Sequence, residues 1–392
     1  MVYSWLPLQE ESLHQQLCDE LHPEKRLMAQ LRKHGAATCC FRTTEGIRAE
    51  VQDDHRNRWV LRPVDTPKSK VGARAMSIEL IDEILNFAPD FIVIKGAGSA
   101  IEERLRAEDL GLVVKLGGPV SPQLLLADIL LSESASQDRQ LQRWFGPPTV
   151  QLPKQVHPAF SSPQVATSDY EFDAVSVGRL VRRKRHRLLE PLLEQGLRVA
   201  IIGDGPLRED LQSRWSKYDN VYFFGTCSAS EIRDIMLRSA VLVHTGTGEG
   251  IPRAVVEAMA VGLPIVGIAG ELDDQFIRTD FGTLVPQDGL AAAVCDARVP
   301  EMRKRMSAAS RRAFERSCSE PTFDAAAIRF ARLIAVERTR ACRAHRWRRD
   351  SPVVVGWVQL LIVVRRALAN LRRRGFGRKI RRFSSMVQFI ER

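Results

Sequence analysis

Residues 241–266 read VLVHTGTGEGIPRAVVEAMAVGLPIV, and this order of residue types predicts a strand, a glycine-rich loop, a helix and a second strand. The apolar run at 241–243 is typical of a strand that is buried on both faces of a parallel sheet. Pro252 stands at the expected first residue of the helix, where a fixed φ and a missing N–H are tolerated. Gly262 and Pro264 are expected to end that helix. The stretch therefore predicts one repeat of a doubly wound α/β domain.

The loop and the start of the helix have the chemistry of an anion site. Three glycines, at 246, 248 and 250, let the backbone turn tightly and approach a ligand, and N–H groups at a helix N-terminus attract negative charge. Glu249 and Glu257 flank that position. An ionised carboxylate only accepts hydrogen bonds, so the two suit sugar or ribose hydroxyls. The simpler alternative is a pair of solvated acids on the helix surface.

The segment EGIPRAVVEAMAVGLPIV, from Glu249 onward, resembles the E-x7-E segment and the E-A-M-A-x-G-x-P-V-V block of the family-four retaining glycosyltransferases, also called group-one glycosyltransferases. The resemblance implies the GT-B architecture, in which two Rossmann-like, doubly wound α/β domains face a cleft. It covers residues 173–287, where the G-D-G-P turn at 203–206 also matches. The first half matches by pattern only: residues 5–7 stand in place of a glycine-rich loop, and 112–118 lacks the family's histidine.

The pattern along the chain predicts four parts, and the resemblance implies the role of each. They are an N-terminal, acceptor-side Rossmann-like domain at 1–158, a nucleotide-sugar-binding Rossmann-like domain at 171–318, a closing helix at 319–345 and a basic amphipathic tail at 346–392. A Pro- and Ser-rich linker is expected at 157–170. Strands are expected near 2–5, 36–42, 58–64, 90–94, 112–116, 128–131, 150–152, 174–177, 199–202, 221–225, 241–243, 265–266 and 282–285, and helices near 24–34, 76–87, 100–107, 300–317 and 322–340.

Length and charge limit the classes of protein. The chain has 392 residues and a net charge of +11, which suffices for two domains and a tail. Residues 332–392 contain 17 Lys and Arg against three acids, so the remainder is slightly acidic. The sequence shows neither a signal peptide nor the roughly 20 consecutive apolar residues of a spanning helix. Seven cysteines without a C-x-x-C motif indicate reduced thiols, and Cys39 and Cys40 are expected on opposite faces of a strand.

The tail combines an apolar run at 352–364 with arginines interleaved among apolar residues. This pattern is typical of helices in an anionic membrane interface. We therefore expect a cytoplasmic protein that is peripheral on the cytoplasmic face of the inner membrane. Packing of the apolar run on the enzyme body and nucleic-acid binding are the alternatives. Because no nucleic-acid-binding motif accompanies the charge, we expect no nucleic-acid partner.

The resemblance implies three catalytic residues. Arg179 and Lys184 follow the strand at 174–177 and correspond to the family's cations on the donor diphosphate, where arginine can contact two oxygens and lysine adds a point charge. Glu249 would lie against the donor sugar. The family commonly has glycine after the lysine, and Arg185 departs from this pattern. The other arginines of this run are expected to form a solvated loop together with Arg185 (Arg182, Arg183 and Arg187).

Donor contacts follow from the same resemblance. Glu257 would bind the ribose hydroxyls, and backbone N–H groups near Gly250 and Ile251 would assist at the diphosphate. Backbone around Gly205 and Gly225 would lie near the nucleobase. Catalysis would be chiefly electrostatic, because cations and a helix terminus stabilise the departing diphosphate.

Two lysines in the first half are weaker candidates. Lys95 and Lys115 follow apolar strands and could contact the acceptor, or they could be ordinary strand-end lysines. Gly96 and Gly98 begin a dinucleotide fingerprint, but Ile101 stands at its third glycine, which disfavours a dehydrogenase. The sequence has no strict Asp-x-Asp motif, so we expect neither a metal nor any other cofactor.

The resemblance, carried by these residues, implies an enzyme that transfers a hexose from a nucleotide diphosphate sugar, with retention, to a lipid-linked or saccharide acceptor. Synthesis of envelope polysaccharide or lipopolysaccharide is the context that the family implies. The alternatives are a non-catalytic GT-B partner subunit and a membrane-associated binding protein. The sequence leaves the nucleobase, the sugar and the acceptor open.

Overall fold

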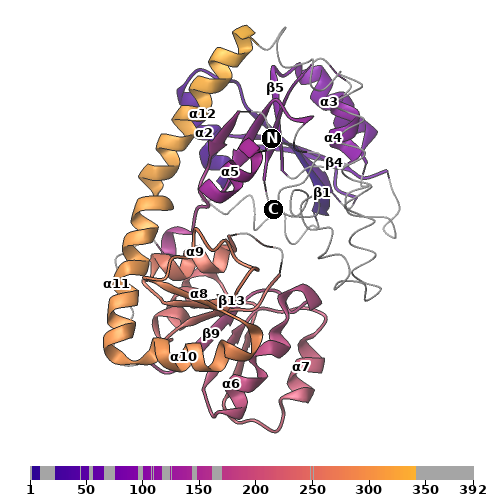
Figure 1. Cartoon of the computed structure of the whole chain (residues 1–392). Coiled ribbons are helices and arrows are strands. Elements are labelled where there is room, and N and C mark those ends of the chain that lie inside the picture. The colour runs from indigo at the N-terminus through magenta and orange to yellow at the C-terminus, as the bar shows by residue number, and fades with distance from the viewer. Residues whose placement is uncertain are drawn as a thin grey trace, which may run out of the picture. The chain divides into compact units, whose positions relative to one another are not determined.

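The computed structural model describes residues 2–8, 23–44, 46–52, 56–65, 76–95, 100–106, 108, 110–116, 124, 126–143, 148–160, 170–247, 249 and 251–340. The chain forms two compact units (Figure 1). Unit 1 contains Met1–Ser132, Gln137–Gln151 and the chain from Ala326, and unit 2 contains Glu133–Ser136 and Leu152–Ala325. The predicted tail at 346–392 and Gly250 lie outside the described residues.

Unit 2 is built on a six-stranded parallel sheet in the order β11-β10-β9-β12-β13-β14. The strand order reverses between β9 and β12, which is where ligands bind in open α/β sheets. Its strands are β9 (Ala174–Val177), β10 (Val199–Ile202), β11 (Val221–Gly225), β12 (Leu242–His244), β13 (Ile265–Ile268) and β14 (Gly282–Val285). Its helices are α6 (Glu190–Glu194), α7 (Arg208–Arg214), α8 (Ala229–Leu237), α9 (Arg253–Ala260), α10 (Leu290–Arg298) and α11 (Pro300–Ser317).

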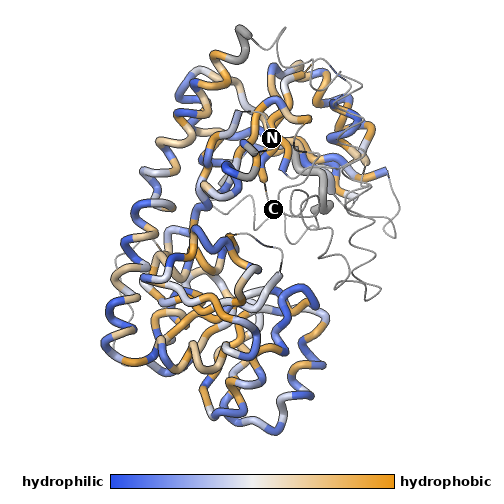
Figure 2. The backbone as a smooth tube through the Cα atoms, in the orientation of Figure 1, coloured by the Kyte–Doolittle hydropathy of each residue, from blue (hydrophilic) through white to orange (hydrophobic). Residues whose placement is uncertain are grey.

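The composition of these strands explains their burial. Every residue of β10, β12 and β13 is buried, because a strand covered by helices on both faces has no solvent-facing side. Figure 2 shows hydrophobic residues gathered along the strands in the middle of unit 2 and hydrophilic residues toward its outer helices. The predicted doubly wound sheet is confirmed.

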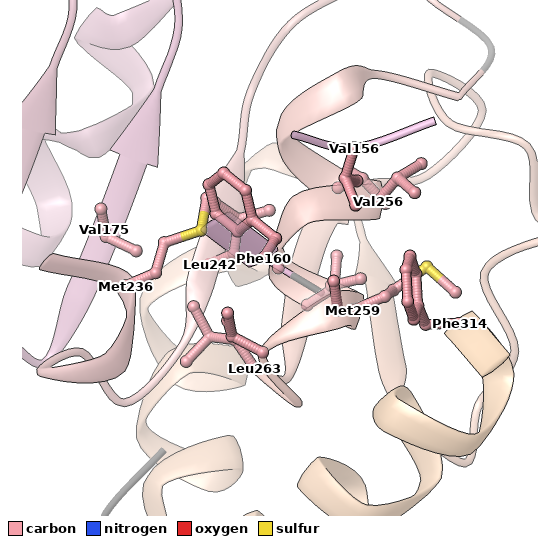
Figure 3. Close-up of a cluster of buried hydrophobic side chains, with 14 of the residues drawn as sticks. Val156, Phe160, Val175, Met236, Leu242, Val256, Met259, Leu263 and Phe314 are labelled. Carbon is pink, nitrogen blue, oxygen red and sulfur yellow. The ribbon is translucent and has the colours of Figure 1, made fainter. Parts of the chain in front are cut away.

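Helix α9 is buried more completely than its sequence pattern predicts. Val255, Val256, Met259 and Ala260 predict one apolar face, but all seven residues from Ala254 to Ala260 are buried. Figure 3 shows Val256 and Met259 of α9 in one cluster with residues of β12 and α11. Pro252 is the residue that caps the helix, not its first helical residue. A carboxylate at position 257 is therefore held in an almost wholly apolar helix.

Unit 1 contains an eight-stranded sheet in the order β3-β4-β2-β1-β5-β6-β7-β8. Its pairs are parallel except for β3 with β4. The strands are β1 (Val2–Leu8), β2 (Cys39–Thr44), β3 (Ala49–Gln52), β4 (Arg58–Pro63), β5 (Phe91–Lys95), β6 (Gly111–Lys115), β7 (Ile129–Ser132) and β8 (Thr149–Gln151). The helices are α2 (Pro23–Lys33), α3 (Ile78–Phe87), α4 (Ala100–Leu105) and α5 (Ala135–Arg143).

Two details of unit 1 bear on the sequence predictions. Strand β1 continues through residues 5–7, which we expected to follow it. Cys39 joins the main core cluster of unit 1, whereas Cys40 packs with Met28 and Trp59, so the two thiols do lie on opposite faces of β2.

The predicted linker and closing helix also have structural counterparts. Pro158–Phe160 forms a short 3-10 helix (η3) whose Phe160 is fully buried in the core of unit 2, so the expected linker does not begin at 157. Helix α12 (Glu320–Arg340) begins in unit 2 and ends in unit 1. Among the described residues, no helix is both long enough and apolar enough to cross a membrane.

Candidate functional site

The loops after β9 and β12 meet through an ion pair. Lys184 ends a 3-10 helix (η4, Arg182–Lys184) in the first loop, and its Nζ lies 2.7 Å from Oε2 of Glu249 in the second. The lysine side chain is 16% exposed and the glutamate side chain 8%. Arg183 Nη1 lies 3.0 Å from the other carboxylate oxygen. Two residues predicted separately from the sequence are thus in contact at the reversal of strand order.

Two buried histidines surround this pair, and the sequence analysis missed both. His244 is the last residue of β12, and its Nε2 lies 3.6 Å from Glu249 Oε2. Burial, with a contribution from nearby Lys184, lowers the pKa of His244 to about 3 and that of His186 to about 4. Both imidazoles are therefore neutral at pH 7, and the positive charge beside Glu249 comes from lysine and arginine.

The basic run at 182–187 is only partly the solvated loop that we expected, because Arg185 is half-buried. Arg185 Nε donates to the backbone carbonyl of Thr245 at 2.8 Å, and its Nη1 lies 3.0 Å from Glu271 Oε1. Thr247 Oγ1 donates to the other oxygen of Glu271 at 2.5 Å. Arg187 pairs with Asp210 on α7. Arg182, Arg183 and Arg187 are exposed, as we expected, although Arg183 and Arg187 have acidic partners. The expectation is wrong for Arg185, whose guanidinium is held by two other loops.

A second feature of the same sheet edge is an open pocket of about 520 Å³ beside Arg179. The loops after β9, β10 and β11 form it. Arg179 itself is exposed. The lining residues are Val177, Gly178, Arg179, Ile202, Gly203, Asp204, Gly205, Thr226, Cys227 and Ile232. The pocket is a suitable place for a planar group near a cation.

Glycine is required where the walls of this pocket touch. A Cβ on Gly203, which has φ +131°, would stand 2.2 Å from the carbonyl oxygen of Gly178, and one on Gly205 would stand 2.6 Å from that of Leu180. Gly203 N–H also donates to the carbonyl of Gly225 at the end of β11 (2.7 Å). The predicted nucleobase residues Gly205 and Gly225 therefore lie in or directly beside one pocket.

Glu257 is a buried carboxylate with a strongly perturbed pKa. Its burial in α9 raises the pKa to about 7, against the opposing charge of Arg253. Burial of an ionised carboxylate in an apolar helix lowers stability. Carboxyl groups with such perturbed pKa values are frequent at functional sites. The contacts among described residues do not join Glu257 or Arg179 to the Lys184–Glu249 pair.

Lys154 holds the backbone next to the glycine-rich loop, and no sequence signal pointed to it. Its Nζ donates to the carbonyl of Ile251 and lies 3.1 Å from Glu133 Oε2. The side chain of Ile251 is buried. The chain just after Glu249 is therefore held both by this packing and by the hydrogen bond from Lys154. Its neighbour Gly250 lies outside the described residues.

The two weaker candidates lie in unit 1. Lys95 ends β5 and Lys115 ends β6, and the two are register partners in that parallel pair. Lys115 is buried, whereas Lys95 is only partly so. The structure thus brings these lysines together, and their contact with an acceptor stays a prediction.

Comparison with known proteins identifies the region that carries the site. Residues 160–312 match the family model described as Glycosyl transferases group 1. Sulfoquinovosyl transferase SQD2 of Arabidopsis thaliana is 27% identical over 217 residues, which cover 52% of this chain and 40% of that protein. GDP-mannose-dependent alpha-mannosyltransferase of Mycobacterium tuberculosis is 32% identical over 140 residues, which cover 35% of this chain and 36% of that protein. The chain thus spans less than half the length of these curated relatives.

The fold has a close solved counterpart. Sucrose-phosphate synthase from Thermosynechococcus elongatus superimposes with a TM-score of 0.65 over 86% of this chain and 98% of its own. Its identity of 16% makes this a likeness of fold alone. Residues 160–312, which carry the Lys184–Glu249 pair and the pocket beside Arg179, are thus similar to the group 1 glycosyltransferases, and the chain has a fold of the GT-B class.

Proposed function

We propose that the protein transfers a hexose from a nucleotide diphosphate sugar, with retention of configuration, to a lipid-linked or saccharide acceptor. The observation that carries this proposal is the Lys184–Glu249 pair at the strand reversal, next to an open pocket lined by Arg179 and glycines. A cation, a carboxylate and a pocket suit the diphosphate, the sugar and the base of such a donor. Two relatives are named as transferases of sulfoquinovose and of mannose from GDP-mannose, which supports the same class.

In this proposal Arg179 and Lys184 bind the donor diphosphate. Lys184 is neutralised by Glu249 in the free protein, so the arriving diphosphate would share its ammonium group with that carboxylate. Glu249 would then face the hexose and accept hydrogen bonds from its hydroxyls. The charge that develops on the leaving diphosphate is stabilised by cations held in place before the reaction. The acceptor proton would pass to the leaving phosphate, so the step needs no protein base and no metal.

Glu257 would bind the ribose. A hydroxyl of the ribose would donate to the carboxylate, which compensates part of the cost of its burial. Its raised pKa supports this role, because burial disfavours the ionised carboxylate in the free protein and the charge of Arg253 compensates only part of this cost. Gly205 and Gly225 would place backbone beside the nucleobase, with Cys227 and Thr226 on the same wall.

The acceptor side rests on weaker support. The paired register of Lys95 and Lys115 provides two cations at one end of the unit 1 sheet, which suits a phosphate-bearing acceptor. The basic, apolar pattern of residues 346–392 supports a peripheral position on the cytoplasmic face of the membrane. Envelope polysaccharide or lipopolysaccharide synthesis is the context proposed.

The test is donor turnover by the full chain. The protein is incubated with UDP-, GDP- and ADP-hexoses in the presence of a chelator, with and without lipid and saccharide acceptors, and the release of nucleoside diphosphate is measured. We expect one donor to be consumed, the product to keep the anomeric configuration of the donor, and Glu257→Ala to lose the activity. Nucleotide binding without any turnover would instead support the partner-subunit alternative, for which the unusual N-terminal half is the best argument.

A further inference from the structure

Arg185 has a backbone conformation that disfavours a side chain. Its φ of 50° and ψ of 38° are left-handed, a region that glycine adopts freely and residues with a Cβ adopt at a cost. The residue lies directly after Lys184, between η4 and a second 3-10 helix (η5, His186–Leu189).

The guanidinium group of Arg185 connects three loops at the carboxyl edge of the sheet. It belongs to the loop after β9, donates to Thr245 O in the loop after β12, and pairs with Glu271 after β13. The same loops share two further bonds. Thr245 Oγ1 donates to Lys184 O at 2.7 Å, and Thr247 N–H donates to Arg183 O at 3.1 Å.

One nitrogen of this group is not satisfied. Arg185 Nη2 is buried and has no hydrogen-bond partner among the described residues. A buried donor without a partner lowers stability, as does the left-handed backbone. Two unfavourable features thus coincide at one residue beside the Lys184–Glu249 pair. Strained residues of this kind are retained where they position a functional group.

We propose that Arg185 is a positioning residue for Lys184 and Glu249. Its guanidinium holds the loops after β9, β12 and β13 together, which keeps the lysine ammonium beside the glutamate carboxylate before any donor arrives. Arg185 acts through Thr245 and Glu271 and need not touch the donor. The consequence for ligand binding rests on the proposed function, whereas the bracing of the loops does not.

The test compares Arg185→Gly, Glu271→Gln and the double variant with wild type, and uses Arg182→Ala as the matched control at an exposed neighbour. Glycine suits the left-handed backbone, so Arg185→Gly is expected to unfold at a temperature close to that of wild type. Amide hydrogen exchange in peptides covering residues 245–249 should become about tenfold faster, because those amides open locally when the brace is lost. Glu271→Gln leaves the backbone conformation untouched and should have the same effect.

Nucleotide affinity is the second readout, with UDP, GDP and ADP as probes. We expect binding of the nucleotide that wild type prefers to weaken by about tenfold in each single variant. The double variant should bind no more weakly than either single variant, because both substitutions remove one brace. Arg185→Lys should restore part of the affinity, since it keeps the charge but cannot bond to both partners.

The outcomes separate the two proposals. Unchanged exchange at 245–249 in Arg185→Gly and Glu271→Gln, or fully additive losses of affinity, would overturn the brace. If wild type binds none of the three nucleotides, the proposed function fails, and hydrogen exchange alone then decides whether Arg185 holds the loops.

Discussion

Lys184 Nζ and Glu249 Oε2 lie 2.7 Å apart, with the lysine on the loop after β9 and the glutamate on the loop after β12. The two strands are neighbours at the reversal of strand order in the unit 2 sheet. Both side chains are largely buried, so each charge depends on the other for compensation. The pair therefore couples two loops as well as supplying the chemistry of the site.

Removing only one charge of this pair should destabilise the protein. Lys184→Met leaves the exposed Arg183 as the remaining counter-ion of the buried Glu249 carboxylate among the described residues, and we expect a loss of about 3 kcal/mol in the free energy of unfolding. Lys184→Met with Glu249→Gln removes both charges and should recover most of that loss. Urea unfolding of the three proteins measures both effects, and equal stability of the single and double variants would contradict the prediction.

Glu257 should make stability depend on pH. Its pKa is about 7 in the folded protein, whereas the ordinary value for glutamate is 4.5. Between these two pH values the folded state therefore binds more protons than the unfolded state. The contribution of Glu257 to the free energy of unfolding is fully present below pH 4.5 and is lost as the pH rises through 7. The total loss is about 3 kcal/mol. Glu257→Gln should therefore gain stability relative to wild type between pH 5 and pH 8.

The exposed Glu194 on α6 provides the control for that comparison. In urea unfolding, Glu194→Gln should have the same free energy of unfolding as wild type at pH 5 and at pH 8. If the unfolding free energies of Glu257→Gln and wild type differ by the same amount at pH 5 and at pH 8, the carboxyl group does not titrate in this range.

Nucleotide binding should release a proton from Glu257. If ribose hydroxyls donate to the carboxylate, the complex favours its ionised form and lowers its pKa. Affinity should then rise as pH increases toward 7 and level off above it. Calorimetry of nucleotide binding at pH 6.5, in two buffers with different ionisation enthalpies, measures the proton count. Glu257→Gln should show no such release, and equal counts in the two proteins would exclude a ribose role for this residue.

Close backbone packing at the pocket should make Gly203 intolerant of substitution. Gly203→Ala would drive a methyl group to 2.2 Å from the carbonyl oxygen of Gly178, and we expect a loss of at least about 3 kcal/mol. Gly196→Ala is the matched control, because its φ is also positive (+73°) but nothing lies within 4 Å of the added atom. That variant should lose only about 1 kcal/mol. Similar unfolding free energies for the two variants would contradict this packing.

The sequence predicted the fold well where local pattern decides it. Apolar runs ending in glycine loops predicted β9, β10 and β12, because parallel strands covered on both faces have no polar positions. Strand β3 was missed, since an edge strand with alternating exposure need not be apolar. The full burial of α9 was missed as well, because the packing of α11 against it depends on residues far along the chain.

The roles of the predicted site residues stay predictions, and the contacts that these residues make could not be predicted from the sequence. Arg185 was assigned to solvent because a run of cations is usually a solvated surface, and its partner Glu271 lies far away in sequence. Arg183 is exposed as expected, but its ion pair with the distant Glu249 was not predicted. His244 has no motif of its own, and only its place at the end of a strand could have marked it. Gly250 and the tail at 346–392 lie outside the described residues, so those predictions stand untested.

In the proposed function, the carboxyl edge of the unit 2 sheet binds the diphosphate of a nucleotide donor. The most direct test of this claim is calorimetric titration of UDP, GDP and ADP, without metal, into wild type, Arg179→Ala and Arg182→Ala. Both arginines are exposed and follow β9, but only Arg179 lines the pocket. We predict that one nucleotide binds wild type and Arg182→Ala alike and binds Arg179→Ala about 10- to 100-fold more weakly. Absence of binding to wild type, or equal binding to the two variants, would contradict the claim.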